Sequence, residues 1–256
     1  MVYFHLQLII QSMNKFGLIG FPLEHSFSKK YFDNKFLNNN IKNASYDNYE
    51  INDIKEFKDL IKNNPEIKGL NVTIPYKKKI IPFLNKIDSK AKLIGAVNVI
   101  KINDDFLIGY NSDYLGFKQS LESWIPNTNF SALVFGSGGS SRAVIQVLKD
   151  MNITYTIVSR SLSNNYKTYK QVMDENLLLT NKLIINTTPL GMFPNVNSCP
   201  NISYDNLSDS HYVYDLVYNP EKTLFIKKCQ EFGSNTKNGL DMLYRQADIA
   251  WNLWNK

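Results

Sequence analysis

The chain has 256 residues, a net charge of +6 at neutral pH, 43% hydrophobic residues and 20% charged residues. This composition is typical of a globular protein with one large or two modest domains. No apolar run approaches the roughly 20 residues that a membrane-spanning helix needs. The lysines are scattered rather than gathered in stretches interleaved with aromatic residues. Small anionic ligands are therefore favoured over nucleic acid as partners.

Two cysteines, Cys199 and Cys229, have no metal-ligand spacing and no nearby histidine pair. They predict a reduced, cytoplasmic protein without a metal site. Residues 1–12 are apolar but lack a basic region and a cleavage site, so they make a poor signal peptide. We interpret them as an extension before Met13.

Strand and helix patterns alternate in the first half of the chain. Strands are expected at 15–21, 44–51 and 67–74, and helices at about 30–38 and 53–63. This alternation predicts an α/β lobe with a mainly parallel sheet.

Polar residues follow the first of these strands. Ser26 and Ser28 lie just before a predicted helix, and from spacing alone they are best explained as its caps. His25 has no patterned carboxylate or nucleophile, so it is interpreted as a structural hydrogen-bonding residue.

Lys77 and Asp113 stand near the ends of later elements. Lys77 follows Pro75, which ends a predicted strand, and open α/β sheets bind ligands beyond the carboxyl ends of strands. The alternative is that Lys77 belongs to a solvated lysine run at 77–79. The alternative for Asp113 is that its side chain caps the N-terminus of the helix that follows it.

A strand, a glycine-rich turn and a helix follow one another in the second half, at 131–135, 136–142 and 143–149. This order is typical of the first unit of a dinucleotide-binding fold. Gly136 permits a tight turn, and Gly138 leaves room for a pyrophosphate at the helix N-terminus. Ser141 takes the place of the third glycine of the usual fingerprint, and a turn without a ligand remains the alternative.

Arg160 lies just after the next predicted strand, at 153–158. Proteins that prefer NAD usually carry an acid there, which binds the ribose 2′-hydroxyl. No acid is present, and a guanidinium can hold a 2′-phosphate, so NADP is favoured. An ordinary surface arginine is the alternative. Met192, in a polar loop after a later strand, is interpreted either as lining the cofactor or as core filling.

The last predicted helix spans about 240–254. Its packing stripe is expected to contain Leu240, Leu243, Ala247, Trp251 and Trp254. Gln246 lies in a neighbouring apolar row with Met242, so a buried polar partner is expected for it.

Eight stretches of the chain together resemble the shikimate dehydrogenase family. They are GFPLEHSFS (20–28), NVTIPYK (71–77), GAVN (95–98), GYNSD (109–113), GSGGSSR (136–142), NTTPLGM (186–192), DLVYNP (215–220) and GLDMLYRQA (239–247). They occur in the family's order and cover about residues 14–254. The family reduces 3-dehydroshikimate to shikimate with NADPH in aromatic amino acid biosynthesis. Lys29 and Phe32 depart from the family pattern, which often has proline and histidine there.

The resemblance implies roles for individual residues. Lys77 and Asp113 would form the catalytic pair. The substrate would be bound by Ser26, Ser28, Asn71, Thr73, Asn98, Tyr218 and Gln246. The cofactor NADP(H) would be bound by Gly136, Ser137, Gly138, Gly139, Ser140, Ser159, Arg160, Ser161, Thr187, Met192, Gly239 and Met242.

The expected architecture is a two-domain α/β fold with a cleft between the domains. A substrate domain covers 1–112, a Rossmann-like NADP-binding domain covers 113–236, and a C-terminal helix at 237–256 returns to the substrate domain. The expected function is NADP-dependent shikimate dehydrogenase, acting as a monomer or homodimer. The alternatives are an NAD-dependent quinate/shikimate dehydrogenase and a non-catalytic NADP-binding regulatory module.

Overall fold

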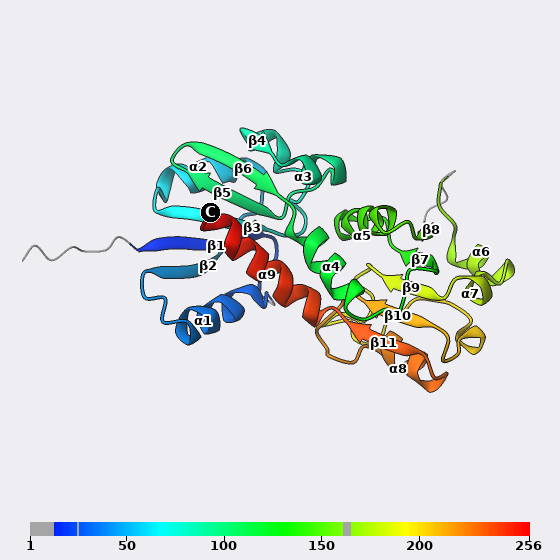
Figure 1. Cartoon of the computed structure of the whole chain (residues 1–256). Coiled ribbons are helices and arrows are strands. Elements are labelled where there is room, and N and C mark those ends of the chain that lie inside the picture. The colour runs from blue at the N-terminus through cyan, green and yellow to red at the C-terminus, as the bar shows by residue number, and fades with distance from the viewer. Residues whose placement is uncertain (1–12, 25, 161–164) are drawn as a thin grey trace, which may run out of the picture. The chain divides into compact units, whose positions relative to one another are not determined.

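The structure is a computed structural model that describes residues 13–24, 26–160 and 165–256 (Figure 1). The expectations for residues 1–12, His25 and Ser161 lie outside these ranges. Contacts divide the chain into two compact units. Unit 1 comprises the chain up to Asp88 with Val97–Tyr110 and Leu253–Lys256, and unit 2 comprises Ser89–Ala96 and Asn111–Asn252.

Unit 1 is built on a six-stranded sheet of order β2-β1-β3-β5-β6-β4. Its strands are β1 (Asn14–Gly20), β2 (Ala44–Glu50), β3 (Ile67–Val72), β4 (Lys86–Ile87), β5 (Val99–Asn103) and β6 (Phe106–Tyr110). The neighbours β1–β2, β1–β3 and β4–β6 are parallel, and β5 runs antiparallel to β3 and β6. The helices are α1 (Ser28–Asn38) and α2 (Phe57–Asn63), with 3₁₀ turns at Ile54–Glu56 and Ile81–Phe83.

Two boundaries in unit 1 differ from the expected ones. Strand β3 ends at Val72 rather than at residue 74, because the Tyr76 amide donates to the Thr73 carbonyl and begins a turn (2.9 Å). Helix α1 begins at Ser28, with Phe27 at the N-cap and no side-chain cap bond. Ser28 is therefore a helical residue and not a cap, whereas the Ser26 hydroxyl accepts a long hydrogen bond from the Ser28 amide (3.3 Å).

The indole of Trp254 is part of the core of unit 1. It stacks on Phe16 with a centroid separation of 4.9 Å and donates from Nε1 to the Ile100 carbonyl (3.0 Å). A Cβ at Gly69 would lie 2.3 Å from the indole, so only glycine permits this close approach. The end of the chain is thus anchored by an aromatic contact and a buried hydrogen bond.

Unit 2 is built on a five-stranded, fully parallel sheet of order β11-β10-β9-β7-β8. Its strands are β7 (Ser131–Phe135), β8 (Thr154–Val158), β9 (Leu183–Asn186), β10 (Tyr212–Asp215) and β11 (Asn235–Asn238). The chain passes from β7 to β8 on one side and returns to β9 on the other. The switch point, where such sheets bind ligands, therefore lies between β7 and β9.

Among the residues that the structure describes, seven helices belong wholly or mainly to unit 2. They are α3 (Ser89–Ile94), α4 (Ser112–Glu122), α5 (Gly139–Asp150), α6 (Tyr169–Asp174), α7 (Leu177–Thr180), α8 (Leu224–Glu231) and α9 (Leu240–Trp254), with a 3₁₀ turn at Tyr204–Asn206. Residues of α5 with helical spacing, among them Val144, Val147 and Leu148, are fully buried, as the periodicity predicts.

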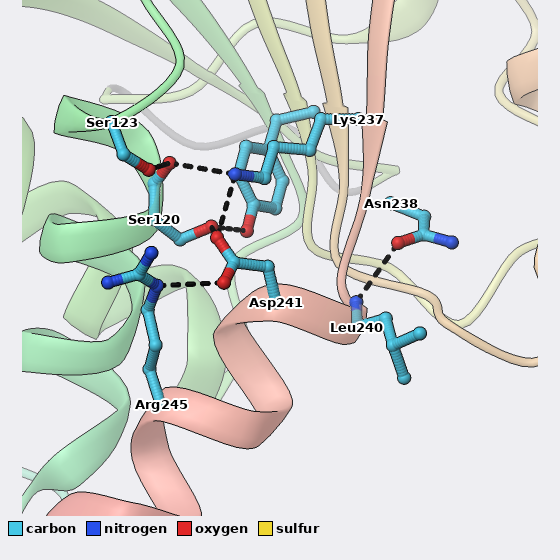
Figure 2. Close-up of polar contacts among 8 residues, drawn as sticks. Ser120, Ser123, Lys237, Asn238, Leu240, Asp241 and Arg245 are labelled. Atoms are coloured by element: carbon cyan, nitrogen blue, oxygen red, sulfur yellow. Dashed lines mark hydrogen bonds and ion pairs between the residues drawn. The ribbon is translucent and has the colours of Figure 1, made fainter.

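The packing stripe of α9 differs from the expected one. Its most buried residues are Met242, Ala247, Ala250 and Trp254, whereas Leu240 and Leu243 are only partly buried. The reason is visible at the start of the helix, where polar contacts fix its rotation (Figure 2). Asp241 accepts hydrogen bonds from Lys237 (2.8 Å), Ser120 (2.7 Å) and Arg245 (2.8 Å).

These contacts also change the acidity of Asp241. Burial alone would raise the pKa of this carboxyl, but the bonds from Lys237, Ser120 and Arg245 outweigh it and lower the pKa to about 2. Ser120 additionally contacts the Tyr214 hydroxyl (2.8 Å), which ties α4 and α9 to β10 within unit 2.

Among the residues that the structure describes, no helix combines the length and apolarity needed to cross a membrane. Within the same residues, no cluster of three or more His, Cys, Asp or Glu side chains could hold a metal ion. The two sheets give the two-domain α/β class that the sequence predicts.

Candidate active site

Three parallel strands of unit 1 end together beside the loop that contains Ser26. Gly20 pairs with Glu50, and Ile19 pairs with Val72, so β1, β2 and β3 finish at one edge of the sheet. The Glu50 carboxylate accepts a hydrogen bond from the Leu23 amide (2.8 Å). This bond fixes the loop after β1, in which half-buried Ser26 lies, against the end of β2.

Asn71 and Asn98 meet at the same edge. Both are buried, with 5% and 3% of their surfaces exposed. The Asn98 carbonyl accepts hydrogen bonds from the Val72 amide (2.9 Å) and from Nδ2 of Asn71 (3.3 Å). Two residues that the sequence predicts to bind substrate are therefore brought into direct contact.

Thr73 and Lys77 follow β3 directly. The Thr73 amide donates to the Ile19 carbonyl (2.9 Å), which keeps Thr73 beside the end of β1. Lys77 is half-buried, unlike its exposed neighbours Lys78 and Lys79. Its carbonyl accepts a hydrogen bond from the Val97 amide (2.7 Å), one residue before Asn98. The Lys77 turn is thus attached to the start of β5, and Lys77 is not part of a uniformly solvated run.

Asp113 belongs to unit 2, in the first turn of α4. The expected alternative, that it caps this helix, is wrong because the cap is Asn111, whose Oδ1 accepts from the Tyr114 amide (3.0 Å). Asp113 is buried, with 6% of its surface exposed.

Gln246 has the polar partner that the sequence predicts. Its Oε1 accepts from the hydroxyl of fully buried Ser112 (3.3 Å), the residue before Asp113. Gly116 permits this approach of α4 and α9, since a Cβ there would lie 3.0 Å from the Gln246 backbone nitrogen. Asp113 and Gln246 are therefore carried by two helices that are packed together within unit 2.

The glycine-rich turn lies at the switch point of the parallel sheet. Gly136 has a φ of 107°, and a Cβ there would lie 2.6 Å from Oγ1 of Thr187. Gly138 has a φ of −80°, and a Cβ there would meet no atom within 4 Å. Gly136 is required by the turn itself, whereas Gly138 borders open space where an anion can approach the first N–H groups of α5.

Ser141 explains why the turn tolerates the loss of the third glycine. Its side chain is buried, and its hydroxyl donates to the Gly136 carbonyl (2.8 Å). The serine therefore closes the turn with a hydrogen bond in place of the close packing that a glycine would permit. Ser137 is exposed in the turn, and Gly139 and Ser140 are half-buried in the first turn of α5.

The loop after β9 is fixed to the glycine turn and to β10. The amide and hydroxyl of Thr187 both donate to the Phe135 carbonyl (2.8 and 2.7 Å). Thr188 donates to Asn186 (2.6 Å), and Asn186 donates to the buried carboxylate of Asp215 (2.9 Å). Burial raises the pKa of Asp215 to about 6, although bonds from Thr223, Val217 and Asn186 oppose the shift.

The remaining predicted residues of unit 2 are placed as follows. Tyr218 is half-buried three residues after Asp215, and Met192 is 43% exposed in the loop after β9. Gly239 follows β11 and approaches the Leu216 carbonyl so closely that a Cβ would lie 2.1 Å from it. Met242 is 7% exposed and packs into the core of unit 2 with Phe117 and Tyr214.

Ser159 and Arg160 follow β8. The Ser159 amide donates to the Lys167 carbonyl (2.8 Å), which holds the strand end in place. Arg160 is exposed, and no acidic residue stands beside it in the sequence. The position and charge are those expected for binding a 2′-phosphate at the end of the second strand of a dinucleotide-binding sheet.

The structure adds residues that the sequence did not single out. Tyr46 contacts Asn71, Ser112 contacts Gln246, and Asp215 anchors two loops. Asp215 was detectable as an acid at the end of a strand, within a stretch quoted for the family. Ser112 also lies within a quoted stretch, 109–113, but its contact with Gln246 gave no signal, and neither did that of Tyr46 with Asn71, because these partners are distant in sequence.

The parallel sheet, the glycine turn at its switch point and the uncapped start of α5 define unit 2 as a dinucleotide-binding domain. Over 253 residues the chain is 40% identical to the shikimate dehydrogenase (NADP(+)) of Methanococcus aeolicus, with 93% of this chain and 90% of the relative covered. The chain therefore belongs to the shikimate dehydrogenase family.

Two further comparisons support this assignment. The family model for the shikimate dehydrogenase substrate binding domain matches residues 18–100, which contain Ser26, Asn71, Lys77 and Asn98. The crystal structure of shikimate dehydrogenase from Aquifex aeolicus is similar with a TM-score of 0.83 and 33% identity, covering 96% of this chain and 93% of that one.

A solved structure of an enzyme with another name is also similar. The quinate dehydrogenase of Corynebacterium glutamicum, solved in complex with NAD, gives a TM-score of 0.83 at 25% identity. The match covers 95% of this chain and 93% of that one. The overall fold therefore does not distinguish the two specificities, which must be argued from individual residues.

Proposed function

We propose that this chain catalyses the reversible, NADPH-dependent reduction of 3-dehydroshikimate to shikimate in aromatic amino acid biosynthesis. The observation that carries this proposal is the 40% identity, over 93% of the chain, to a relative named shikimate dehydrogenase (NADP(+)). The residues described above fit this activity in both units.

Lys77 and Asp113 are the proposed catalytic pair. Reduction of a ketone requires a proton on the oxygen, and NADPH, when bound, supplies the hydride. The Lys77 ammonium can polarise the carbonyl and donate that proton from Nζ. Asp113 can accept a hydrogen bond from a hydroxyl of the substrate. The role of Lys77 is supported by its half-buried position after β3, and that of Asp113 by its burial at the start of α4.

Neutral side chains are proposed to bind the substrate. Hydroxyl and amide groups can read the geometry of the substrate's hydroxyls and carboxylate without adding charge. The two buried asparagines and the serine loop at the edge of unit 1 support this role, as does the Ser112-bound amide in unit 2. The proposed residues are Ser26, Ser28, Asn71, Thr73, Asn98, Tyr218 and Gln246.

The cofactor is proposed to lie along the carboxyl edge of the parallel sheet. The N–H groups at the start of α5 can bind the phosphates of a dinucleotide, because no side chain caps this helix and the space beside Gly138 is open. Arg160 and Ser159 would hold the 2′-phosphate. Thr187, Met192 and Gly239 would line the nicotinamide end, with Met242 supporting them from the core.

An NAD-dependent quinate/shikimate dehydrogenase is the second candidate. It is favoured by the likeness to the quinate dehydrogenase solved with NAD. It is disfavoured by Arg160 and by the absence of an acid after β8. A non-catalytic NADP-binding module is a third possibility, which the presence of both Lys77 and Asp113 disfavours.

One experiment separates these functions. Purified chain is given shikimate or quinate together with NADP+ or NAD+, and the absorbance of the reduced cofactor is followed. We expect kcat/KM to be highest for shikimate with NADP+. Higher kcat/KM for quinate with NAD+ would support the second candidate, and absence of turnover in all four combinations would support the third.

We further propose that the chain works as a monomer or homodimer in the cytoplasm. Two unpaired cysteines, one buried and one half-buried, support a reducing compartment. Light scattering coupled to size-exclusion chromatography would contradict the first proposal if it gave a larger assembly. Fractionation of the source cells would contradict the second if the chain were found outside the cytoplasm.

A further inference from the structure

Tyr46 is a fully buried tyrosine on β2, beside the polar edge of unit 1. None of its surface is exposed, and its ring stacks on Phe32 with a centroid separation of 4.3 Å and an interplanar angle of 12°. Trp254 lies against the same rings, at 5.5 Å from Phe32 and 6.3 Å from Tyr46. The aromatic cluster therefore fixes where the Tyr46 hydroxyl points.

The Tyr46 hydroxyl contacts a residue proposed to bind substrate. It donates to Oδ1 of Asn71 (2.8 Å). Burial raises the pKa of Tyr46 well above its usual value, although Ser28 opposes the shift. The phenol consequently keeps its proton, and Tyr46 remains a donor.

A backbone group sets the direction of the hydrogen bond between Tyr46 and Asn71. The Asn98 carbonyl can only accept, so the atom of Asn71 that faces it must be Nδ2 (3.3 Å). Oδ1 of Asn71 then faces Tyr46, which must donate to it. The carboxamide of Asn71 is thereby held at both ends, and one of its two N–H groups is not used by the bond to Asn98.

We propose that Tyr46 is a positioning residue that orients the Asn71 carboxamide for the substrate. The inference rests on the proposed substrate-binding role of Asn71. Tyr46 acts through Asn71 and does not itself touch the reacting atoms. Without its hydroxyl, Oδ1 of Asn71 would lose a buried donor and the amide would be free to rotate.

The variant Tyr46→Phe removes only this hydroxyl. We expect KM for shikimate to rise about tenfold, the effect of losing one orienting hydrogen bond in a buried site. We expect kcat to stay within about threefold and the Kd for NADP+ to be unchanged, because a misplaced Asn71 weakens substrate binding more than proton transfer. A shikimate KM equal to that of the wild-type chain would overturn the proposal.

Tyr214→Phe is the matched control. Tyr214 is also fully buried, and its hydroxyl contacts a serine, Ser120 (2.8 Å). It lies in the core of unit 2, where its ring contacts Phe117 and Trp124. A similar loss of thermal stability in both variants, with a raised shikimate KM only in Tyr46→Phe, would support positioning. Equal rises in KM would overturn it, because loss of stability would then suffice.

A double-mutant cycle identifies the residue through which Tyr46 acts. If Tyr46 orients Asn71, adding Tyr46→Phe to Asn71→Ala should raise the shikimate KM much less than it does in the wild-type chain. If Tyr46→Phe raised the shikimate KM by the same factor in the Asn71→Ala variant as in the wild-type chain, the proposal would be overturned. If Asn71→Ala alone leaves KM unchanged, the substrate-binding role of Asn71 fails, and the inference fails with it. Absence of shikimate turnover by the wild-type chain would instead reject the proposed function.

A second substitution covers the case in which Tyr46→Phe does not fold. Replacing Tyr46 with 4-aminophenylalanine keeps the ring and an N–H donor at the same place. We expect this variant to have a shikimate KM within about twofold of the wild-type value, because the donor to Asn71 is restored. A folded variant, shown by an unchanged NADP+ Kd, with a tenfold higher shikimate KM would overturn the proposal.

Discussion

The edges of the two sheets hold their proposed site residues in different ways. In unit 1, Asn71 and Asn98 are 5% and 3% exposed and are joined by side-chain and backbone hydrogen bonds. In unit 2, Gly138 and Arg160 are exposed, and Met192 is 43% exposed. One edge is preorganised through buried side chains, and the other presents backbone and long side chains to solvent.

This difference suits the two kinds of ligand. A small polyhydroxylated acid offers few atoms, so its recognition requires polar groups in fixed orientations. A dinucleotide is long and carries phosphates, which backbone N–H groups and a single guanidinium can hold. Substitutions at the edge of unit 1 should therefore affect substrate parameters, and substitutions at the edge of unit 2 should affect cofactor parameters.

The largest effect is expected at Lys77. Lys77→Ala should lower kcat by about 10²-fold or more, the scale of lost acid–base catalysis, while shikimate binding weakens much less. Steady-state kinetics and shikimate titration measure the two quantities. Lys78→Ala removes an exposed neighbouring charge and is the control, for which kcat should be unchanged. A kcat for Lys77→Ala within a few-fold of wild type would remove this residue from the mechanism.

Arg160 tests the cofactor edge. Arg160→Ala should raise KM for NADP+ by about ten- to a hundredfold, since it removes a charge-assisted contact worth about 1.5–3 kcal/mol. KM for NAD+ should hardly change, because NAD+ lacks the 2′-phosphate. Lys170→Ala is the control, since Lys170 is exposed in the same unit and pairs with Asp174. Equal losses with both cofactors would mean that Arg160 supports the fold instead.

Ser26 tests the substrate edge. Ser26→Ala should raise the shikimate KM through the loss of a hydrogen bond to a charged carboxylate, worth about 1.5–3 kcal/mol. The Kd for NADP+ should stay nearly constant. If cofactor affinity fell equally, the serine would be acting on the fold, for example through its bond from the Ser28 amide.

The two glycines of the turn separate folding from cofactor binding. Gly136→Ala should lower the free energy of unfolding by about 1–3 kcal/mol, because the backbone is left-handed and the methyl group would meet Thr187. Gly138→Ala should change stability by less than about 0.5 kcal/mol, since its methyl group meets no protein atom. It should instead raise the NADP+ Kd, by about tenfold, by filling the space where the pyrophosphate approaches.

Denaturant unfolding and cofactor titration of both glycine variants check these expectations. A destabilised Gly138→Ala variant, or one with unchanged NADP+ affinity, would contradict the role given to the open space at Gly138.

Much of unit 2 could be predicted from the sequence because its signals are local. An apolar strand, a glycine turn and an amphipathic helix within about 20 residues predict the β7–α5 unit. The structure confirms this order, but α5 begins at Gly139 rather than at residue 143, so the second half of the expected turn is helical. The cap of α4 was expected at Asp113 and not at Asn111, because both are good cap residues by type. The end of β3 was misplaced because the residues after it keep an alternating pattern while the backbone turns.

The tertiary contacts of the site could not be predicted from the sequence, for a different reason. Tyr46 and Asn71 are 25 residues apart, and Ser112 and Gln246 are 134 apart. No periodicity links such pairs, since they meet only when strands and helices assemble. The rotation of α9 was mispredicted likewise, because contacts of Asp241 with Ser120 and Lys237 select which face is buried.

The most direct test of the account is a crystal structure of the chain with shikimate and NADP+ bound. The account predicts shikimate hydrogen-bonded to Ser26, Asn71 and Lys77, and the 2′-phosphate within hydrogen-bonding distance of Arg160. Shikimate bound away from the edge formed by β1, β2 and β3, or a 2′-phosphate without contact to Arg160, would contradict it.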